Sequence, residues 1–210
     1  MQAYVSHTGA WLPWDAMYDD EAGERLAQWI DDNVGDDEFN NRVVMTPQKT
    51  GNAIDSPPIL AALARNAPWV SARSPGPPQH GLFVAAWPLE ANLQHGIERA
   101  HDATLIVFPW GDRLGFDGWA AAVGAFNAAT GESTQPLAGE LDKEFRGLLL
   151  YSNELGQSAQ RGEQRRMLQT SMSVFKTAGL SEDFVVTYCL GLGYRGNHQN
   201  IRNHYRAARP

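Results

Sequence analysis

The sequence predicts an α/β fold, a three-layer domain built around a short and mostly parallel sheet. Two consecutive units support this, because each joins a continuous apolar run to a helical segment: 81–87 with 89–101, then 104–109 with a helix from Asp117. Parallel strands that are buried on both faces consist of such apolar runs, and helices cover the faces of the sheet between them. A chain of 210 residues is also long enough for one such domain with a helical extension.

The elements before these two units are predicted from periodicity and from helix-capping residues. Residues 1–18 are rich in aromatic side chains but show no clear period, so neither a strand nor a helix is assigned to them. An apolar stripe predicts a helix over 19–34, and the acidic residues at its start suit the helix dipole. Short strands are expected over 42–46 and 69–73, with a helix between them that Ser56 caps.

The pattern becomes helical after a polar linker at 131–139, and the helical segments are 141–157, 160–178, 181–192 and 197–208. Gly179 is placed to terminate the second of these helices. The segment 181–192 is ambiguous, since Ser181 suits a helix start while 184–189 has the composition of a strand. We favour a helix there.

These elements divide the chain into three segments that we expect to pack as one globular unit. Residues 1–41 form an acidic helical segment, 42–130 form the α/β core domain, and 131–210 form a helical subdomain. Strands that alternate with helices in this way predict a Rossmann-like arrangement for the core domain.

Composition points to a soluble cytoplasmic protein. A single cysteine, Cys189, excludes an internal disulfide and fits a reducing compartment. The longest apolar runs are far shorter than the ~20 residues that span a bilayer, and the N-terminus shows no secretory signal. We therefore expect no membrane association.

Charge is distributed unevenly along this chain of net charge −7. Residues 1–41 contain ten acidic side chains against Arg25 alone, whereas 143–210 contain ten basic and five acidic side chains. A solvated acidic face explains the first segment without any partner. Alternatively, the two ends attract each other, within one chain or between the two copies of a homodimer.

Polar and aromatic residues follow the predicted strands, and parallel strands bring their carboxyl ends to one edge of the sheet, where ligands bind. The residues at this edge are Lys49, Thr50, Asn52, Trp87, Trp110, Asp112 and Arg113. Lys49 with Arg113 can hold an anion, and the two tryptophans can stack on a planar ring. Asp112 is the candidate catalytic residue, as a base, and it could alternatively bind a hydrated metal. The alternative is that these residues have no functional role and are ordinary polar loop residues.

A second candidate is an arginine stripe near the C-terminus. Arg202, Arg206 and Arg209 recur at nearly helical spacing, and Arg195 and His198 extend the stripe. Facing outward, these side chains could meet nucleic-acid phosphates or the acidic segment. Arginines at a helix C-terminus also suit the helix dipole without any partner, and we regard nucleic acid as the less favoured reading.

The remaining residues predict no metal site and no cofactor. His95, Glu98 and His101 are spread over too much of a helix to converge on one ion, and Cys189 lies in an apolar run typical of a core residue.

Three function classes stay open. The first, which we favour, is a non-catalytic protein that recognises a protein partner or a small ligand. Such a protein could have a regulatory role. The second is an enzyme acting on a nucleotide or phosphate ester at the strand edge, and the third is a nucleic-acid binder.

Overall fold

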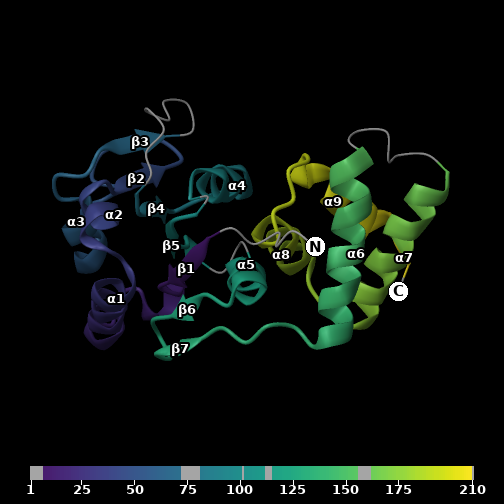
Figure 1. Ribbon diagram of the computed structural model, residues 1–210, viewed down its shortest axis with the longest axis horizontal. Coiled ribbons are helices and arrows are strands. Elements are labelled where there is room, and N and C mark those ends of the chain that lie inside the picture. The colour runs from purple at the N-terminus through teal and green to yellow at the C-terminus, as the bar shows by residue number, and fades with distance from the viewer. Residues whose placement is uncertain (1–6, 72–80, 101, 112–114, 156–161, 210) are drawn as a thin grey trace.

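The computed structural model describes residues 7–71, 81–100, 102–111, 115–155 and 162–209. Within these ranges the strands form one sheet in the order β3-β2-β4-β5-β1-β6-β7 (Figure 1). The strands are β1 (Thr8–Trp11), β2 (Val43–Thr46), β3 (Trp69–Ser71), β4 (Phe83–Ala86), β5 (Thr104–Phe108), β6 (Phe126–Asn127) and β7 (Glu132–Ser133). Neighbouring strands from β3 to β6 are parallel to each other. Of the strands described, β7 is the one that is antiparallel to its neighbour, β6. The predicted Rossmann-like α/β fold is confirmed.

Side chains of the central strands alternate between two buried faces. Val44, Val84 and Ile106 pack into one hydrophobic cluster. Their neighbours Met45, Ala85 and Val107 pack into the other. Because water reaches neither face, these strands consist of apolar residues throughout, which explains why the sequence showed them as continuous runs.

The first face is covered by α1 (Asp20–Asn33) and α3 (Pro58–Ala64), whose buried residues join the cluster around Val44. A short 3-10 helix, η1 (Trp14–Ala16), and α2 (Asp36–Asn40) complete this part of the chain. Asp19 caps α1 through a 2.9 Å bond from Glu21 N to its carboxylate, as expected for a helix that begins with acidic residues. The helix α3 begins at Pro58, so Pro57 stands at the cap position that was predicted for Ser56.

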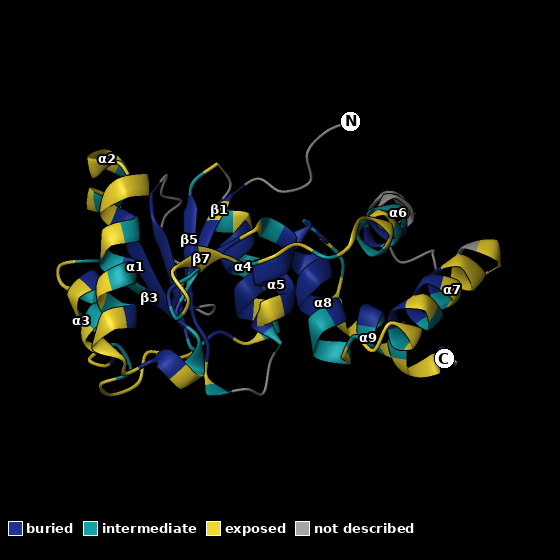
Figure 2. Cartoon of the chain, turned by 90° about the horizontal axis from the view of Figure 1, so that it is seen from below, coloured by how far each residue is buried: buried dark blue, intermediate teal, exposed yellow. Residues whose placement is uncertain are grey.

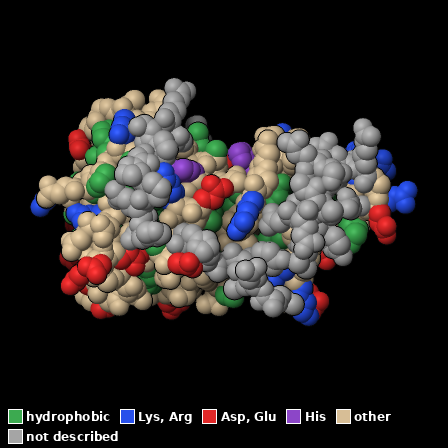
Figure 3. Space-filling model, turned by 45° about the horizontal axis from the view of Figure 1, so that its top comes forward, with side chains coloured by type: hydrophobic (Ala, Val, Ile, Leu, Met, Phe, Trp, Pro, Cys, Tyr) green, Lys and Arg blue, Asp and Glu red, His purple; other side chains and the backbone are tan. Residues whose placement is uncertain are grey.

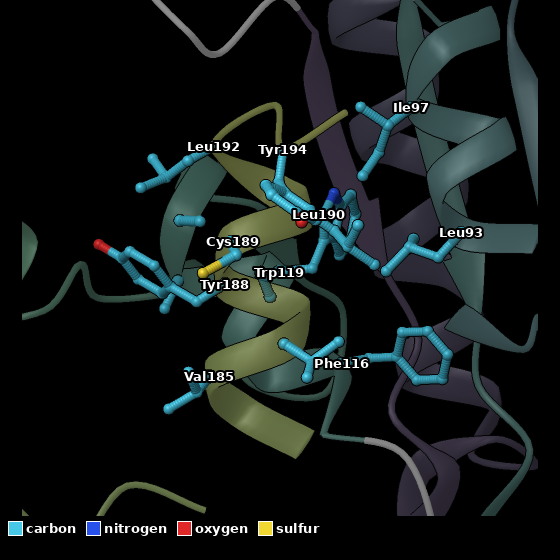
Figure 4. Close-up of a cluster of buried hydrophobic side chains, with 14 of the residues drawn as sticks. Leu93, Ile97, Phe116, Trp119, Val185, Tyr188, Cys189, Leu190, Leu192 and Tyr194 are labelled. Carbon is cyan, nitrogen blue, oxygen red and sulfur yellow. The ribbon is translucent and has the colours of Figure 1, made fainter. Parts of the chain in front are cut away.

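The opposite face is covered by α4 (Glu90–Arg99) and α5 (Phe116–Val123), and behind them lies α8 (Glu182–Gly191). The segment 181–192 is therefore a helix, with Ser181 as its cap. Figure 4 shows side chains of α8, including Cys189 and Leu190, among those of α4 and α5. Because α8 is buried along most of its length (Figure 2), its composition resembles that of a buried strand.

The outer layer consists of α6 (Gly139–Leu155), α7 (Glu163–Thr177) and α9 (His198–Ala207). Gly179, which has a positive φ, follows the end of α7 as predicted. Figure 2 shows that these helices bury one side and expose the other. No helix within the described ranges is long and apolar enough to cross a membrane.

The strand β1 was not expected from the sequence. It lies between β5 and β6, so the sheet takes a strand from the 1–41 segment that sequence analysis kept apart from the α/β core. The run is short, and it includes Gly9, where a Cβ atom would stand 2.9 Å from the indole of Trp119. A small residue is required at that position because the α5 indole packs directly on the strand.

Candidate functional site

The carboxyl ends of β2, β4, β5 and β1 lie on one edge of the sheet because these strands are parallel. The loops that carry Lys49, Trp87 and Trp110 therefore leave the sheet on the same side, which is the arrangement that the sequence predicted. Asp112 and Arg113 lie outside the residues that the structure describes. The predicted anion site between Lys49 and Arg113 stays a prediction.

Three tryptophans gather at this edge, one after each of three neighbouring strands. Trp14 follows β1, Trp87 follows β4, and Trp110 follows β5. The ring centroids of Trp87 and Trp110 are 5.3 Å apart, and Trp14 lies 5.7 Å from Trp110 and 6.3 Å from Trp87. The edge-to-face and tilted geometries are those that aromatic rings favour. The sequence identified two members of this cluster and missed Trp14.

The loop after β2 is folded onto itself and onto Trp87. Thr50 N donates to Gln48 O at 3.1 Å, and the Trp87 indole donates to Ala53 O at 2.6 Å. Lys49, Thr50 and Asn52 are all exposed. They stand beside the tryptophan cluster as solvated loop residues, and they do not line the pocket described next.

A pocket of about 620 Å³ opens at the carboxyl ends of β5, β1 and β6. This volume lies within the range of sites for small molecules. The pocket is lined by Trp11, Pro13, Trp14, Asp15, Pro109, Gly111, Gly115, Phe116, Asp117, Asn127, Ala129, Thr130, Ser181 and Asp183. Five parts of the chain thus contribute to one cavity, and Trp14 connects it to the tryptophan cluster.

The pocket lies where the helices that follow neighbouring strands go to opposite faces of the sheet. β1 leads to α1, which packs in one hydrophobic cluster, whereas β5 leads to α5, which packs in the other. Such a topological switch point leaves a crevice between the two departing loops, and ligands of open α/β sheets bind there.

Local hydrogen bonds hold the wall that β1 and β6 provide. The Trp11 indole donates to Thr134 Oγ1 at 3.2 Å, and Ala129 N donates to Asn127 Oδ1 at 2.9 Å. Arg25 on α1 donates from Nε to Ala128 O at 2.7 Å and from Nη2 to Ala129 O at 2.9 Å. The position of this wall is therefore fixed from α1 as well as from the sheet.

The opposite wall depends on close packing between α5 and α8. Gly118 has no room for a Cβ atom, which would overlap the carbonyl oxygen of Phe184. The Thr187 hydroxyl donates to Gly115 O, directly before α5. These contacts bring the first turn of α8, with Ser181 and Asp183, to the first turn of α5, with Phe116 and Asp117.

Two carboxylates of the pocket have raised pKa values. Asp117 keeps contact with solvent, but partial loss of hydration by the surrounding protein raises its pKa, and a 3.0 Å hydrogen bond from Gly118 N to its carboxylate acts in the opposite direction. Burial also raises the pKa of Asp183, and the nearby charges of Glu182 and Asp117 add to this rise. The charge of Arg206 acts in the opposite direction on Asp183 without reversing the rise, so both pocket aspartates are easier to protonate than free aspartate.

Asp183 also belongs to an ion-pair network beneath the pocket, centred on Arg202. The Arg202 guanidinium is 2.5 Å from both Asp183 Oδ1 and Glu182 Oε1, and it also contacts Glu90 of α4. Its side chain is only 11% exposed. His198 Nε2 lies 3.4 Å from Glu90 Oε2, and burial lowers the pKa of this histidine. The network joins α9 to α8 and α4.

The network changes the interpretation of the arginine stripe. Arg202 points into the protein, and Arg206 pairs with Glu182 at 2.7 Å, whereas Arg195 and Arg209 are exposed. The acidic partners of Arg202 and Arg206 come from α4 and α8, outside the acidic segment 1–41. On the face shown in Figure 3, lysine and arginine side chains form separate small groups rather than one basic surface.

Comparison with known proteins adds no assignment, because no family model, no curated protein and no solved structure matches this chain. Within the described ranges, no group of three histidine, cysteine, aspartate or glutamate side chains could hold a metal ion. Cys189 is fully buried, and burial raises the pKa of its thiol, as expected for a core residue.

Sequence analysis missed Trp11, Trp14, Asp15, Asp117 and Asp183 as pocket residues. The dipeptide Pro13-Trp14 recurs as Pro109-Trp110 after β5, but it also recurs as Pro68-Trp69, where Trp69 begins β3. The dipeptide therefore gives no signal for a strand that ends before Trp14. The sequence holds no signal for Asp183 either, because its approach to the pocket depends on how α8 packs against α5.

Proposed function

We propose that this protein recognises a small ligand in the pocket at the carboxyl ends of β5, β1 and β6. One observation carries the proposal: a pocket of about 620 Å³ lies at a topological switch point of a parallel sheet. Its aromatic and polar lining matches that of small-molecule sites, in which apolar surface supplies affinity and a few polar groups supply orientation.

A thermal-shift screen of the full chain tests this function. The panel contains nucleotides, sugar phosphates, sugars, organic amines and amino acids. A ligand at 100 times its dissociation constant adds about 2.7 kcal/mol of stability, which raises the melting temperature of a chain of this size by roughly 5 to 10 °C.

Two variants then locate the ligand. Trp14→Leu removes an aromatic wall of the pocket and should abolish the shift, and Thr130→Trp should do the same by filling the pocket. Lys49→Ala is the matched control at the other end of the edge and should leave the shift intact. A shift that disappears in Lys49→Ala but survives in Trp14→Leu would place the ligand at the β2 loop and contradict the proposal.

An acid–base enzyme at the same pocket is the second candidate, and the raised pKa of Asp117 favours it. A carboxyl group whose pKa is raised within a pocket is a typical general acid or base. Under this alternative, NMR detects conversion of the bound ligand over time. Asp117→Asn then abolishes conversion but retains the thermal shift. A ligand that binds and stays unchanged supports recognition without catalysis.

Other sequence-derived expectations stay predictions. They are the cytoplasmic location, the homodimer and the phosphate-ester enzyme that uses Lys49, Asp112 and Arg113. Nucleic-acid binding through the arginine stripe also stays a prediction, and two of its members, Arg202 and Arg206, pair with carboxylates.

A further inference from the structure

We infer that the pocket takes a small organic cation, such as an ammonium group carried on an apolar or planar body. This inference names the ligand class for the site of the proposed function and rests on that function. Three aspartates from three separate elements line the cavity: Asp15 from η1, Asp117 from α5 and Asp183 from α8. The lining includes no lysine or arginine within the part of the chain that the structure describes.

The walls suit the same ligand. Trp11 and Trp14 line one side, and Phe116, which is almost fully buried, lines the other. The face of an aromatic ring attracts a cation, most strongly in the case of tryptophan. Carboxylates together with indole rings therefore favour an organic cation on two independent grounds, charge and cation–π attraction.

Electrostatics within the pocket point the same way. Asp117 is close enough to Asp183 for its charge to help raise the pKa of Asp183. A ligand cation between them would offset this repulsion, whereas a phosphate ester would add to it. Arg202 holds Asp183 from beneath the pocket, and Arg202 is not part of the lining.

Helix dipoles give a simpler reason for two of these carboxylates. Asp117 and Asp183 stand in the first turns of α5 and α8, where negative side chains are favoured in any helix. That preference accounts for acidic residues in each first turn. It does not account for the convergence of both turns on one cavity with Asp15 and two tryptophans.

Calorimetric titration of the full chain with two matched ligand pairs tests the inference. Choline is compared with its neutral isostere 3,3-dimethylbutan-1-ol, and tryptamine is compared with tryptophol. In each pair the two molecules have nearly the same shape, so the ratio of their dissociation constants measures the preference for charge. We expect at least one cation to bind tenfold or more tightly than its neutral partner, and we expect added salt to reduce this ratio.

Charge variants separate the pocket from the general acidity of the protein. Asp15→Asn/Asp117→Asn should bring the ratio close to one. Asp31→Asn/Asp32→Asn removes the same charge from the exposed surface of α1 and should leave the ratio unchanged. A ratio that falls equally in both double variants would mean non-specific attraction and would overturn the inference.

Two further outcomes distinguish the inference from the proposed function. If the neutral partners bind as well as the cations, or if only sugars or nucleotides bind in a Trp14-dependent way, the cation preference is wrong and the pocket function stands. If no member of the wider screen binds, both are wrong.

Discussion

The carboxyl edge of the described sheet has two switch points, and they differ in how many segments surround them. Between β5 and β1 several segments form a pocket, although Asp15 and Asp117 in its lining are exposed, whereas Lys49, Thr50 and Asn52 near β2 and β4 are exposed and do not line that pocket. Strand direction is the same at both points. The parallel sheet therefore determines where loops meet, but it does not determine which meeting point becomes a cavity.

The difference comes from segments that are distant in sequence. At β5 and β1, the turn after β6 and the first turn of α8 supply two further walls. At β2 and β4, the structure shows the β2 loop tied to Trp87 through Ala53 O. The start of α8 is thus part of the pocket wall, and substitutions at its contacts with α5 and α9 test whether the proposed function depends on it.

The largest effect is expected from Gly118→Ala, which acts on the contact between α5 and α8. The added Cβ would overlap the Phe184 carbonyl, and a backbone atom cannot rotate away. We expect a loss of about 3 kcal/mol in the free energy of unfolding. Urea denaturation measures this loss, and the same variant should lose the pocket ligand while its secondary structure by circular dichroism persists.

The matched control for this substitution is Gly23→Ala in α1, where a Cβ atom meets nothing within 4 Å. Alanine is the better helix former, so this variant should gain about 0.5 to 1 kcal/mol. Equal stability of the two alanine variants would show that α8 does not pack against α5 as closely as it does in the structure.

Much of the fold could be predicted because short stretches of sequence determine the strands and helices. The runs 81–87 and 104–109 could be assigned as parallel strands from their continuous apolar composition, and the carboxyl edge followed from their direction. Trp87 and Trp110 could be placed at that edge for the same reason. These predictions needed only neighbours in sequence and a general rule of topology.

The pocket could not be predicted because its walls are set by tertiary packing. β1 is too short to show a period, and its small Gly9 is explained only by the Trp119 indole that lies on it. Arg202 appeared as a surface charge in the sequence because its carboxylate partners come from α4 and α8. Spacing along one helix does not show what packs against that helix.

A smaller effect is expected from Arg202→Ala, which acts on the network beneath the pocket. Removal of the guanidinium leaves Glu90, Glu182 and Asp183 without their shared counter-charge. Breaking a fully buried pair costs about 3 to 5 kcal/mol, and we expect about 2 kcal/mol here because the carboxylates keep some contact with water. Urea denaturation measures the loss.

Arg206→Ala is the control for this prediction, because Arg206 also pairs with Glu182 but its side chain is 62% exposed. We expect little change in stability, as for most exposed ion pairs. If Arg206→Ala destabilised the protein as much as Arg202→Ala, the position of Arg202 inside the network would not matter, and the coupling of α9 to the pocket would be wrong.

The smallest effect is a pH dependence with opposite signs at two aspartates, one inside the pocket and one outside it. The pKa of Asp117 is raised in the folded protein, so the unfolded chain gives up this proton first as pH rises. Asp117 therefore reduces stability progressively from the ordinary aspartate pKa of 3.8 up to its raised pKa, and the reduction is constant above that. Asp117→Asn should be more stable than the parent at pH 7, with the advantage shrinking on acidification.

Asp142 on α6 supplies the opposite case. Burial acts to raise its pKa, but hydrogen bonds from Arg146 at 2.7 Å and from Tyr188 at 2.8 Å prevail, so the pKa is lowered. Its contribution to stability is present above the unfolded pKa and is lost as pH falls through the folded one. Asp142→Asn should therefore be less stable than the parent at pH 7, and this deficit should also shrink in acid. Urea denaturation of both variants between pH 3 and pH 7 measures the two differences. Curves of the same sign would mean that the folded protein favours the charged form of Asp117, as it does for Asp142, and would contradict the raised pKa of Asp117.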